Sequence, residues 1–202
     1  MAELSKVTVL GAGSWGTALA GLLAGGGRPV VIWAREPEVV EEINTLHENR
    51  TFLPDAPLPP NLTATGDLSE AVSGAAVVVS VVPSQFVDTV MTEAAPHMNP
   101  EVIVVSASKG IETATLRRMD QVMEAHLTPD QMERFCVLSG PSFAREVAEQ
   151  QPTAVVVASH SQGARLLVQG LFQTPYFRVY TNPVSYTHLT LPTICFKCGS
   201  RG

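Results

Sequence analysis

The amino-acid sequence predicts an α/β fold built on a doubly wound parallel sheet. Short apolar runs rich in β-branched residues alternate with segments of helical composition along most of the chain. The connections between these segments are short, which is typical of strand–helix–strand crossovers. The run over residues 75–82 is the most apolar segment of the chain, as expected of a central strand that is covered on both faces.

Strands are expected where apolar and β-branched residues cluster over a few positions and a turn residue follows. The first such run ends at Gly11, and the run over 75–82 is too short and too β-branched to prefer a helix. These criteria predict strands over residues 7–10, 30–33, 75–82, 102–106, 136–139, 153–158 and 177–180.

Helices are expected in the intervening segments. Val39, Val40, Ile43 and Leu46 follow a helical spacing, whereas the prolines over residues 52–60 forbid regular structure there. The same reasoning predicts helices over residues 14–23, 36–46, 67–74, 84–95, 116–127 and 162–172.

The composition excludes several classes of protein. Hydrophobic residues make up 45% of the chain and charged residues 16%, which is too apolar for a disordered chain. A formal net charge of −6 weighs against a nucleic-acid partner. No window approaches the roughly 20 apolar residues of a membrane span, and residues 1–10 lack the pattern of a signal peptide. Three cysteines form no disulfide framework, so we expect a cytoplasmic protein.

The strongest local pattern is the turn Gly11-Ala12-Gly13-Ser14-Trp15-Gly16, which follows the first strand and opens the first helix. Gly11 permits a tight turn, Gly13 lets a diphosphate approach the backbone, and Gly16 lets the helix pack close to the sheet. The free N–H groups of a helix N-terminus favour phosphate. The pattern therefore predicts a dinucleotide site, and a tight turn without ligand is the alternative.

The end of the second strand bears on the choice of dinucleotide. This position usually holds an acidic residue that binds ribose hydroxyls, but the chain has Arg35 followed by Glu36. Arg35 favours the 2′-phosphate of NADP(H), while Glu36 is expected to cap the next helix. A solvated surface arginine is the alternative, so NAD(H) and NADP(H) both remain open.

Four segments together resemble bacterial NAD(P)-dependent glycerol-3-phosphate dehydrogenase, and the resemblance extends from residue 6 to about 183. They are residues 11–20 (GAGSWGTALA), 49–54 (NRTFLP), 81–85 (VVPSQ), and 108–110 (SKG) with 139–144 (SGPSFA). The resemblance implies a Rossmann-type domain. It also implies reversible hydride transfer between dihydroxyacetone phosphate and sn-glycerol 3-phosphate, which feeds phospholipid synthesis, in a homodimer.

The resemblance assigns roles residue by residue. It implies that the dinucleotide is contacted by Ser14, Trp15, Arg35, Lys109 and Ala144. It implies that the small phosphate substrate is contacted by Lys109, Gly140 and Ser142, with Gly140 admitting the ligand to the backbone. Phe86 is expected either near the nicotinamide or as an ordinary core residue.

The family pattern stops near residue 183. Residues 184–202 resemble the conceptual translation of a transposon-end sequencing adapter, so we expect a dinucleotide-binding domain over 1–183 followed by a non-native tail. The helical substrate domain and its proton-transferring lysine are then expected to be missing, which leaves no catalytic residue here and predicts binding without turnover. Cys195 and Cys198 in that tail supply only half of a usual zinc site, and His188 is not expected to act as a base, so no metal is expected.

Two other functions compete with this interpretation. A related dehydrogenase acting on a hydroxy acid would share the glycine turn but not Lys109-Gly110 or Gly140-Pro141-Ser142 at these spacings. A non-catalytic module that senses the dinucleotide would need an appended effector domain.

Overall fold

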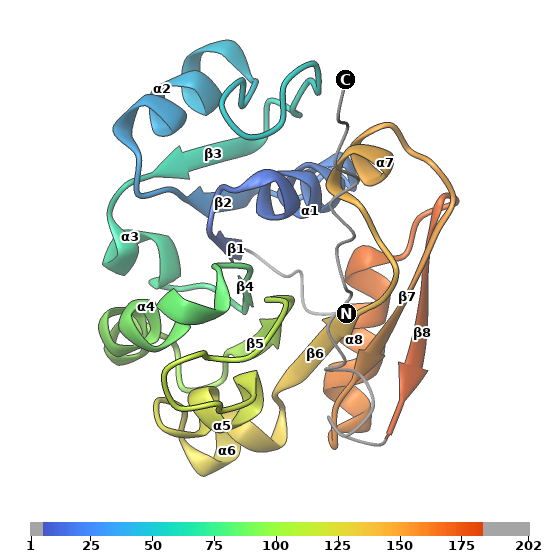
Figure 1. Cartoon of the computed structure of the whole chain (residues 1–202). Helices are drawn as coiled ribbons and strands as arrows, with labels where there is room; N and C mark the ends of the chain where they lie inside the picture. Colours follow the sequence, from blue (N-terminus) through green and yellow to red (C-terminus); the bar gives the residue numbers. More distant parts are fainter. Residues whose placement is uncertain (1–5, 184–202) are drawn as a thin grey trace, which may run out of the picture.

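An eight-stranded sheet in the order β3-β2-β1-β4-β5-β6-β7-β8 runs through the molecule, as the computed structural model shows for residues 6–183 (Figure 1). The strands are β1 (Val7–Leu10), β2 (Val30–Trp33), β3 (Leu62–Thr65), β4 (Val77–Ser80), β5 (Ile103–Ser106), β6 (Cys136–Ser139), β7 (Thr153–Ala158) and β8 (Phe177–Asn182). The helices are α1 (Ser14–Gly25), α2 (Pro37–Leu46), α3 (Leu68–Val72), α4 (Val87–Ala94), α5 (Met119–Glu124), α6 (Pro129–Glu133), α7 (Ala144–Ala148) and α8 (Gln162–Phe172), with 3-10 turns η1 (Ser84–Phe86) and η2 (Ala95–His97).

The strand order creates a switch point beside β1. The chain builds outward from β1 through β2 to β3, and then returns to place β4 on the other side of β1. In open α/β sheets, ligands bind in the crevice at the carboxyl ends of the strands where the order reverses. The glycine turn after β1 therefore lies at the expected place for a ligand.

Two apolar clusters cover the two faces of the sheet. Val7, Val9, Val77 and Val79 belong to the cluster that includes residues of α1, α2 and α8. Leu10, Val78 and Val104 belong to the other, with residues of α3, α4 and α5. These last helices follow one another along the left and lower side of the molecule in Figure 1. Because both faces are covered, the central strands β1, β4 and β5 are fully buried and mostly apolar.

The predicted fold class is confirmed, but the sheet is not parallel throughout. Strands β1 to β6 run parallel, whereas β7 pairs antiparallel with β6 and parallel with β8. A parallel crossover needs a connection that carries the chain back along the strand. The only helix described between β6 and β7 is α7, which has five residues and so spans about 7.5 Å. The chain therefore turns back and pairs in the opposite direction.

Three elements were not predicted, and two predicted helices begin three residues later, one of them because residues 84–86 form the 3-10 turn η1 before α4. Strand β3 alternates buried and exposed residues at the sheet edge, and α6 and α7 are too short to show a helical period. The helix predicted from Leu116 begins at Met119, because Leu116 adopts a left-handed backbone with φ of 59°. Within residues 6–183, no helix combines the length and the apolar composition that a membrane crossing requires.

Gly16→Ala is expected to lower the free energy of unfolding by about 2 kcal/mol or more, since overpacking against rigid groups is costly. A Cβ at Gly16 would stand 1.8 Å from the carbonyl oxygen of Gly11, which is backbone and cannot rotate away. Urea denaturation measures the loss.

Gly25→Ala at the end of the same helix is the matched control. A Cβ there meets nothing within 4 Å, and alanine is the better helix former, so stability should stay level or rise. Equal losses in the two variants would contradict the close approach at Gly16.

Candidate functional site

The turn from β1 into α1 has the geometry of a phosphate-binding loop. Gly11 adopts a φ of 107°, which favours glycine, and its amide donates to the Trp33 carbonyl oxygen at 3.0 Å. Gly13 is exposed, and a Cβ there would meet nothing within 4 Å. Among the residues that the structure describes, none accepts a hydrogen bond from the Gly13 amide. The N-cap residue of α1 is therefore exposed, and its N–H has no protein acceptor among the described residues.

Three segments that lie far apart in the sequence meet beside this turn. The Lys109 ammonium, in the loop after β5, lies 5.1 Å from the centroid of the Trp15 ring at the start of α1. It also donates to the Ser142 carbonyl oxygen at 2.9 Å, in the loop between β6 and α7. This cation–π contact and hydrogen bond place a positive charge at the carboxyl edge of the sheet, next to the glycine turn.

The segment over residues 49–53 packs under the same turn. Asn49 is fully buried, and its amide donates to the Ala12 carbonyl oxygen at 2.9 Å and to the Thr17 hydroxyl at 2.8 Å. The Ser14 hydroxyl donates to the Phe52 carbonyl oxygen at 2.5 Å. Two parts of the chain that are 32 or more residues apart are thereby joined by polar contacts, and the two that Asn49 makes are buried.

The matching family model and the similar curated proteins agree on one family. A family model described as NAD-dependent glycerol-3-phosphate dehydrogenase N-terminus matches residues 6–165. The chain belongs to this family. A Geobacter metallireducens protein named glycerol-3-phosphate dehydrogenase (NAD(P)+) is 55% identical over 177 residues, which cover 88% of this chain and 53% of that protein.

Solved structures carry the same name. Glycerol-3-phosphate dehydrogenase from Coxiella burnetii superposes with a TM-score of 0.81 at 34% identity, covering 88% of this chain and 53% of that one. The enzyme from Saccharomyces cerevisiae gives a TM-score of 0.78 at 30% identity, covering 89% and 56%. The chain therefore spans about half the length of the relatives that it matches.

Within this glycerol-3-phosphate dehydrogenase domain, Gly140 has a different reason for being glycine than the one expected. A Cβ there would lie 2.9 Å from the Ala154 carbonyl oxygen and from Val155 Cα, both on β7. The missing side chain thus allows the β6 end to pack against the neighbouring strand, and on that side there is no room for a ligand.

The remaining predicted residues differ in exposure, since two of them are buried or packed against the core and Arg35 is exposed. Ser142 is buried at 3% exposure, and Ala144 begins α7 and packs against the apolar cluster that contains α1. Arg35 instead leaves its side chain 75% exposed and pairs with Glu36 at 3.1 Å. Glu36 occupies the N-cap position of α2, as expected, but its side chain makes no capping hydrogen bond.

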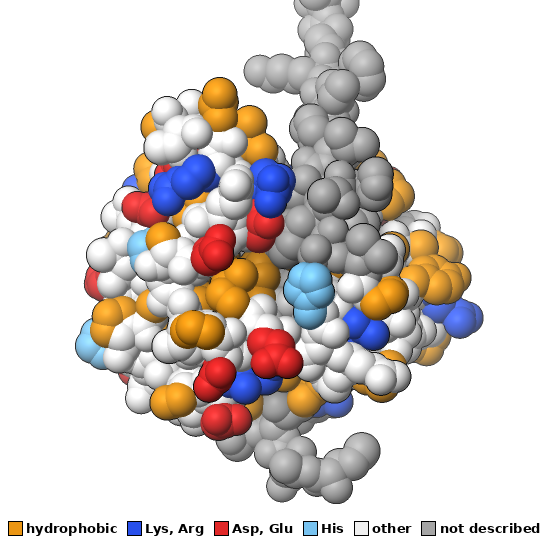
Figure 2. Space-filling view, turned by 90° about the horizontal axis from the view of Figure 1, so that it is seen from below, with side chains coloured by type: hydrophobic (Ala, Val, Ile, Leu, Met, Phe, Trp, Pro, Cys, Tyr) orange, Lys and Arg blue, Asp and Glu red, His pale blue; other side chains and the backbone are white. Residues whose placement is uncertain are grey.

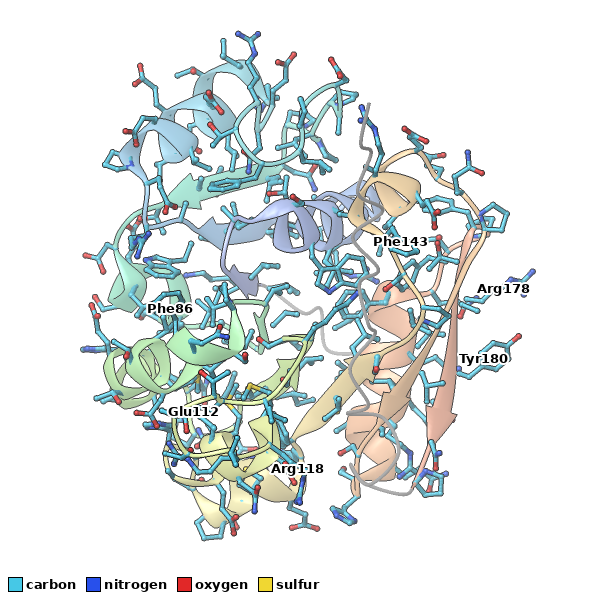
Figure 3. All side chains as sticks on the ribbon, viewed as in Figure 1. Phe86, Glu112, Arg118, Phe143, Arg178 and Tyr180 are labelled. Carbon is cyan, nitrogen blue, oxygen red and sulfur yellow. The ribbon has the colours of Figure 1, made fainter. Side chains whose placement is uncertain are left out.

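Phe86 is 51% exposed, so the expectation of an ordinary core phenylalanine is wrong. Figure 3 labels it on η1, together with Phe143, which precedes α7 and is 56% exposed. Sequence analysis assigned Asn49 no role, because the only signal at this position was that it belongs to a segment resembling the family.

On the face seen in Figure 2, basic side chains stand singly or beside acidic ones, and no continuous basic surface is visible among the described residues.

No group of three or more histidine, cysteine, aspartate or glutamate side chains within residues 6–183 is arranged to hold a metal ion. Cys136 is fully buried, and burial raises the pKa of its thiol to about 11, so this side chain stays protonated. Cys195, Cys198 and His188 lie outside the described residues.

A cluster of charges holds the loop that follows Lys109. Glu112, labelled in Figure 3, is buried and accepts from Arg117 Nε at 3.0 Å and from the Thr115 hydroxyl. Arg117 also reaches Asp88 on α4 at 3.2 Å, and His126 Nε2 lies 3.1 Å from the same oxygen of Asp88. The Arg117 hydrogen bond lowers the pKa of Glu112, and the His126 hydrogen bond lowers that of Asp88.

These lowered pKa values predict how stability depends on pH. A carboxyl group with a depressed pKa in the folded state stabilises the protein fully above its unfolded pKa, about 4, and loses this effect as pH falls through the folded value. Arg117→Gln should therefore lower the melting temperature at neutral pH, and its difference from the unmodified chain should shrink as the pH falls below about 4.

Thermal unfolding followed by circular dichroism at a series of pH values tests this. Arg50→Gln is the control, because the Arg50–Glu48 pair is largely exposed and such pairs contribute little. A difference between the Arg117 variant and the unmodified chain that is the same at every pH would contradict the role of the two carboxylates.

Proposed function

We propose that this chain is the dinucleotide-binding part of an oxidoreductase that interconverts dihydroxyacetone phosphate and sn-glycerol 3-phosphate with NADPH or NADH. Membership of the family supports the reaction type. The observation that carries the proposal is the meeting of Trp15, Lys109 and Ser142 beside the glycine turn, since the resemblance assigned these residues to dinucleotide and substrate. The reaction is proposed for the whole enzyme, and dinucleotide binding for this chain.

The residues of the turn fit a diphosphate. The space over Gly13 is open, where a side chain would fill it, and the N-terminus of the 12-residue α1 adds partial positive charge. In this proposal, Gly11, Gly13, Ser14 and Gly16 shape the diphosphate site, and Trp15 and Ala144 line it. The bound dinucleotide supplies hydride transfer.

Lys109 is proposed to serve both ligands. Its ammonium is fixed by the Trp15 ring and the Ser142 carbonyl, so it is oriented before a ligand arrives. A fixed positive charge next to the reacting carbon stabilises a developing alkoxide or a phosphate, because it needs no reorganisation during the reaction. Ser142 and Gly140 are proposed to complete the substrate side, through backbone groups near Lys109.

Further properties are proposed for the whole enzyme on the strength of the family. We propose a cytoplasmic homodimer that supplies glycerophospholipid synthesis, with residues 1–183 as the dinucleotide-binding domain. The segment 184–202 departs from the family pattern and is proposed to be foreign to the natural gene. The proton-transferring lysine of the whole enzyme is proposed to lie in its substrate domain, which residues 1–183 do not include.

Replacing Lys109 tests the proposed site. Lys109→Met should weaken NADPH binding by about tenfold or more, since it removes a charge-assisted contact worth about 1.4 kcal/mol or more. Titration of the chain with NADPH, followed by nicotinamide fluorescence, measures the dissociation constant.

Lys6→Met provides a matched control at the opposite end of β1. Lys6 also donates to two backbone carbonyls, Glu70 at 2.8 Å and Ser73 at 2.9 Å, but far from the glycine turn. Its replacement should leave NADPH affinity unchanged. Full affinity in the Lys109 variant, or no NADPH binding by the unmodified chain, would refute the proposed function.

Arg35 tests the choice of dinucleotide. The exposed guanidinium stands at the end of β2, where it can reach a 2′-phosphate once its contact with Glu36 is exchanged. Arg35→Ser should weaken NADPH binding by about tenfold while changing NADH binding by less than about twofold. Parallel titrations with the two dinucleotides measure the ratio, and an equal loss for both would show that Arg35 does not read the 2′-phosphate.

A further inference from the structure

Asn49 is fully buried and makes three hydrogen bonds, two of which join its loop to the glycine turn and to α1. Its Nδ2 donates to the carbonyl oxygen of Ala12 and to the hydroxyl of Thr17, and its Oδ1 accepts from the Phe52 amide at 3.0 Å. These partners determine which side-chain atom of Asn49 is Nδ2 and which is Oδ1, because a carbonyl oxygen only accepts and a backbone N–H only donates. The side chain is therefore held in one orientation.

The carbonyl oxygen of Ala12 is the centre of this arrangement. It accepts from Asn49 at 2.9 Å and from the Thr17 hydroxyl at 3.1 Å, so both of its lone pairs are directed into the protein. Thr17 is itself fully buried, and its hydroxyl accepts from Asn49. The three groups form a closed triangle of hydrogen bonds beneath the glycine turn.

The peptide unit between Ala12 and Gly13 links this triangle to the ligand side. In a trans peptide, the C=O and N–H bonds point in opposite directions across one plane, and the chain has no cis peptide among the described residues. Holding the Ala12 carbonyl inward therefore aims the Gly13 N–H outward. Gly13 is exposed, and the space on its Cβ side, where a diphosphate is proposed to bind, is open.

We propose that Asn49, together with Thr17, is the positioning residue that aims the Gly13 amide at the diphosphate. This inference rests on the proposed function and adds a residue that acts through the backbone without touching the ligand. Without Asn49, the carbonyl keeps only the Thr17 bond, and the peptide plane is held less firmly. A loosely held peptide unit loses more conformational entropy when the ligand binds, so the affinity for the ligand falls.

Asn49→Leu, of similar size, tests the proposal in the 202-residue chain. Its dissociation constant for NADPH should rise by about tenfold, a change of about 1.4 kcal/mol. The spectroscopic signature is the amide resonance of Gly13 in ¹⁵N–¹H spectra. Adding NADPH should shift this resonance downfield in the unmodified chain, and the shift should be much smaller in the variant.

Asn61→Leu is the control for a merely structural effect. Asn61 also donates to two backbone carbonyls, Ala24 at 2.8 Å and Arg28 at 2.5 Å, but beyond the other end of α1. We expect this variant to melt at a lower temperature and to keep its NADPH affinity within about twofold. An Asn49 variant with unchanged affinity and an unchanged Gly13 shift, or an Asn61 variant that loses as much affinity, would overturn the inference.

Thr17 gives a second measurement if Asn49→Leu does not fold. Thr17→Val removes the hydroxyl from the triangle and should weaken NADPH binding by about threefold or more, while Thr17→Ser should recover most of that affinity. Equal affinities for the two variants would overturn the inference while leaving the proposed function intact. Absence of NADPH binding by the unmodified chain would overturn both.

Discussion

The close approach of α1 to the end of β1 is the constraint on which the rest of the site depends. It exists because Gly16 has no side chain, since a Cβ there would stand 1.8 Å from the Gly11 carbonyl oxygen. With α1 in this position, its first turn opens at the switch point between β1 and β4, and its N–H groups face the crevice. A methyl group added at Gly16 would displace the helix. Gly13, Ser14 and Trp15 would then move together, because the rest of the helix is packed in the core.

Contacts from distant segments then fix the details of the turn. The loop at Asn49 supports it from below, and Lys109 lies over Trp15 and reaches Ser142. Lys109 depends in turn on the loop that Glu112 and Arg117 close against α4. A parallel sheet brings these loops to one edge, because the carboxyl ends of neighbouring strands lie side by side. The site is thus a product of topology, and few of its residues are neighbours in the sequence.

Much of the fold could be predicted because its strands are apolar on both faces. The bounds of β1, β2, β6 and β7 agree with the prediction, since these strands are short apolar runs that are rich in β-branched residues. Strand β3 could not be found, because it lies at an edge and only Leu62 and Ala64 of its residues are buried. The reversal at β7 depends on the length of α7, which has too few residues to show a period.

The candidate site divides in the same way. The glycine turn could be predicted because each glycine is explained by the local backbone geometry of a strand–turn–helix unit. The residues that meet Lys109 could be assigned only through the family resemblance, because no spacing in the sequence connects them. The substrate contact of Gly140 stays a prediction, whereas its tight packing against Ala154 and Val155 of β7 could not be predicted, because these residues lie 14 and 15 positions further along the chain. Asn49 escaped notice because a buried asparagine looks like an exposed one until its partners are known.

A crystal structure of the chain with NADPH tests the central claim most directly. It should place a diphosphate oxygen about 3 Å from the Gly13 nitrogen, with the Ala12 carbonyl still turned toward Asn49 and the nicotinamide end directed toward Lys109. A dinucleotide bound elsewhere, or a diphosphate that does not approach the Gly13 amide, would contradict the account.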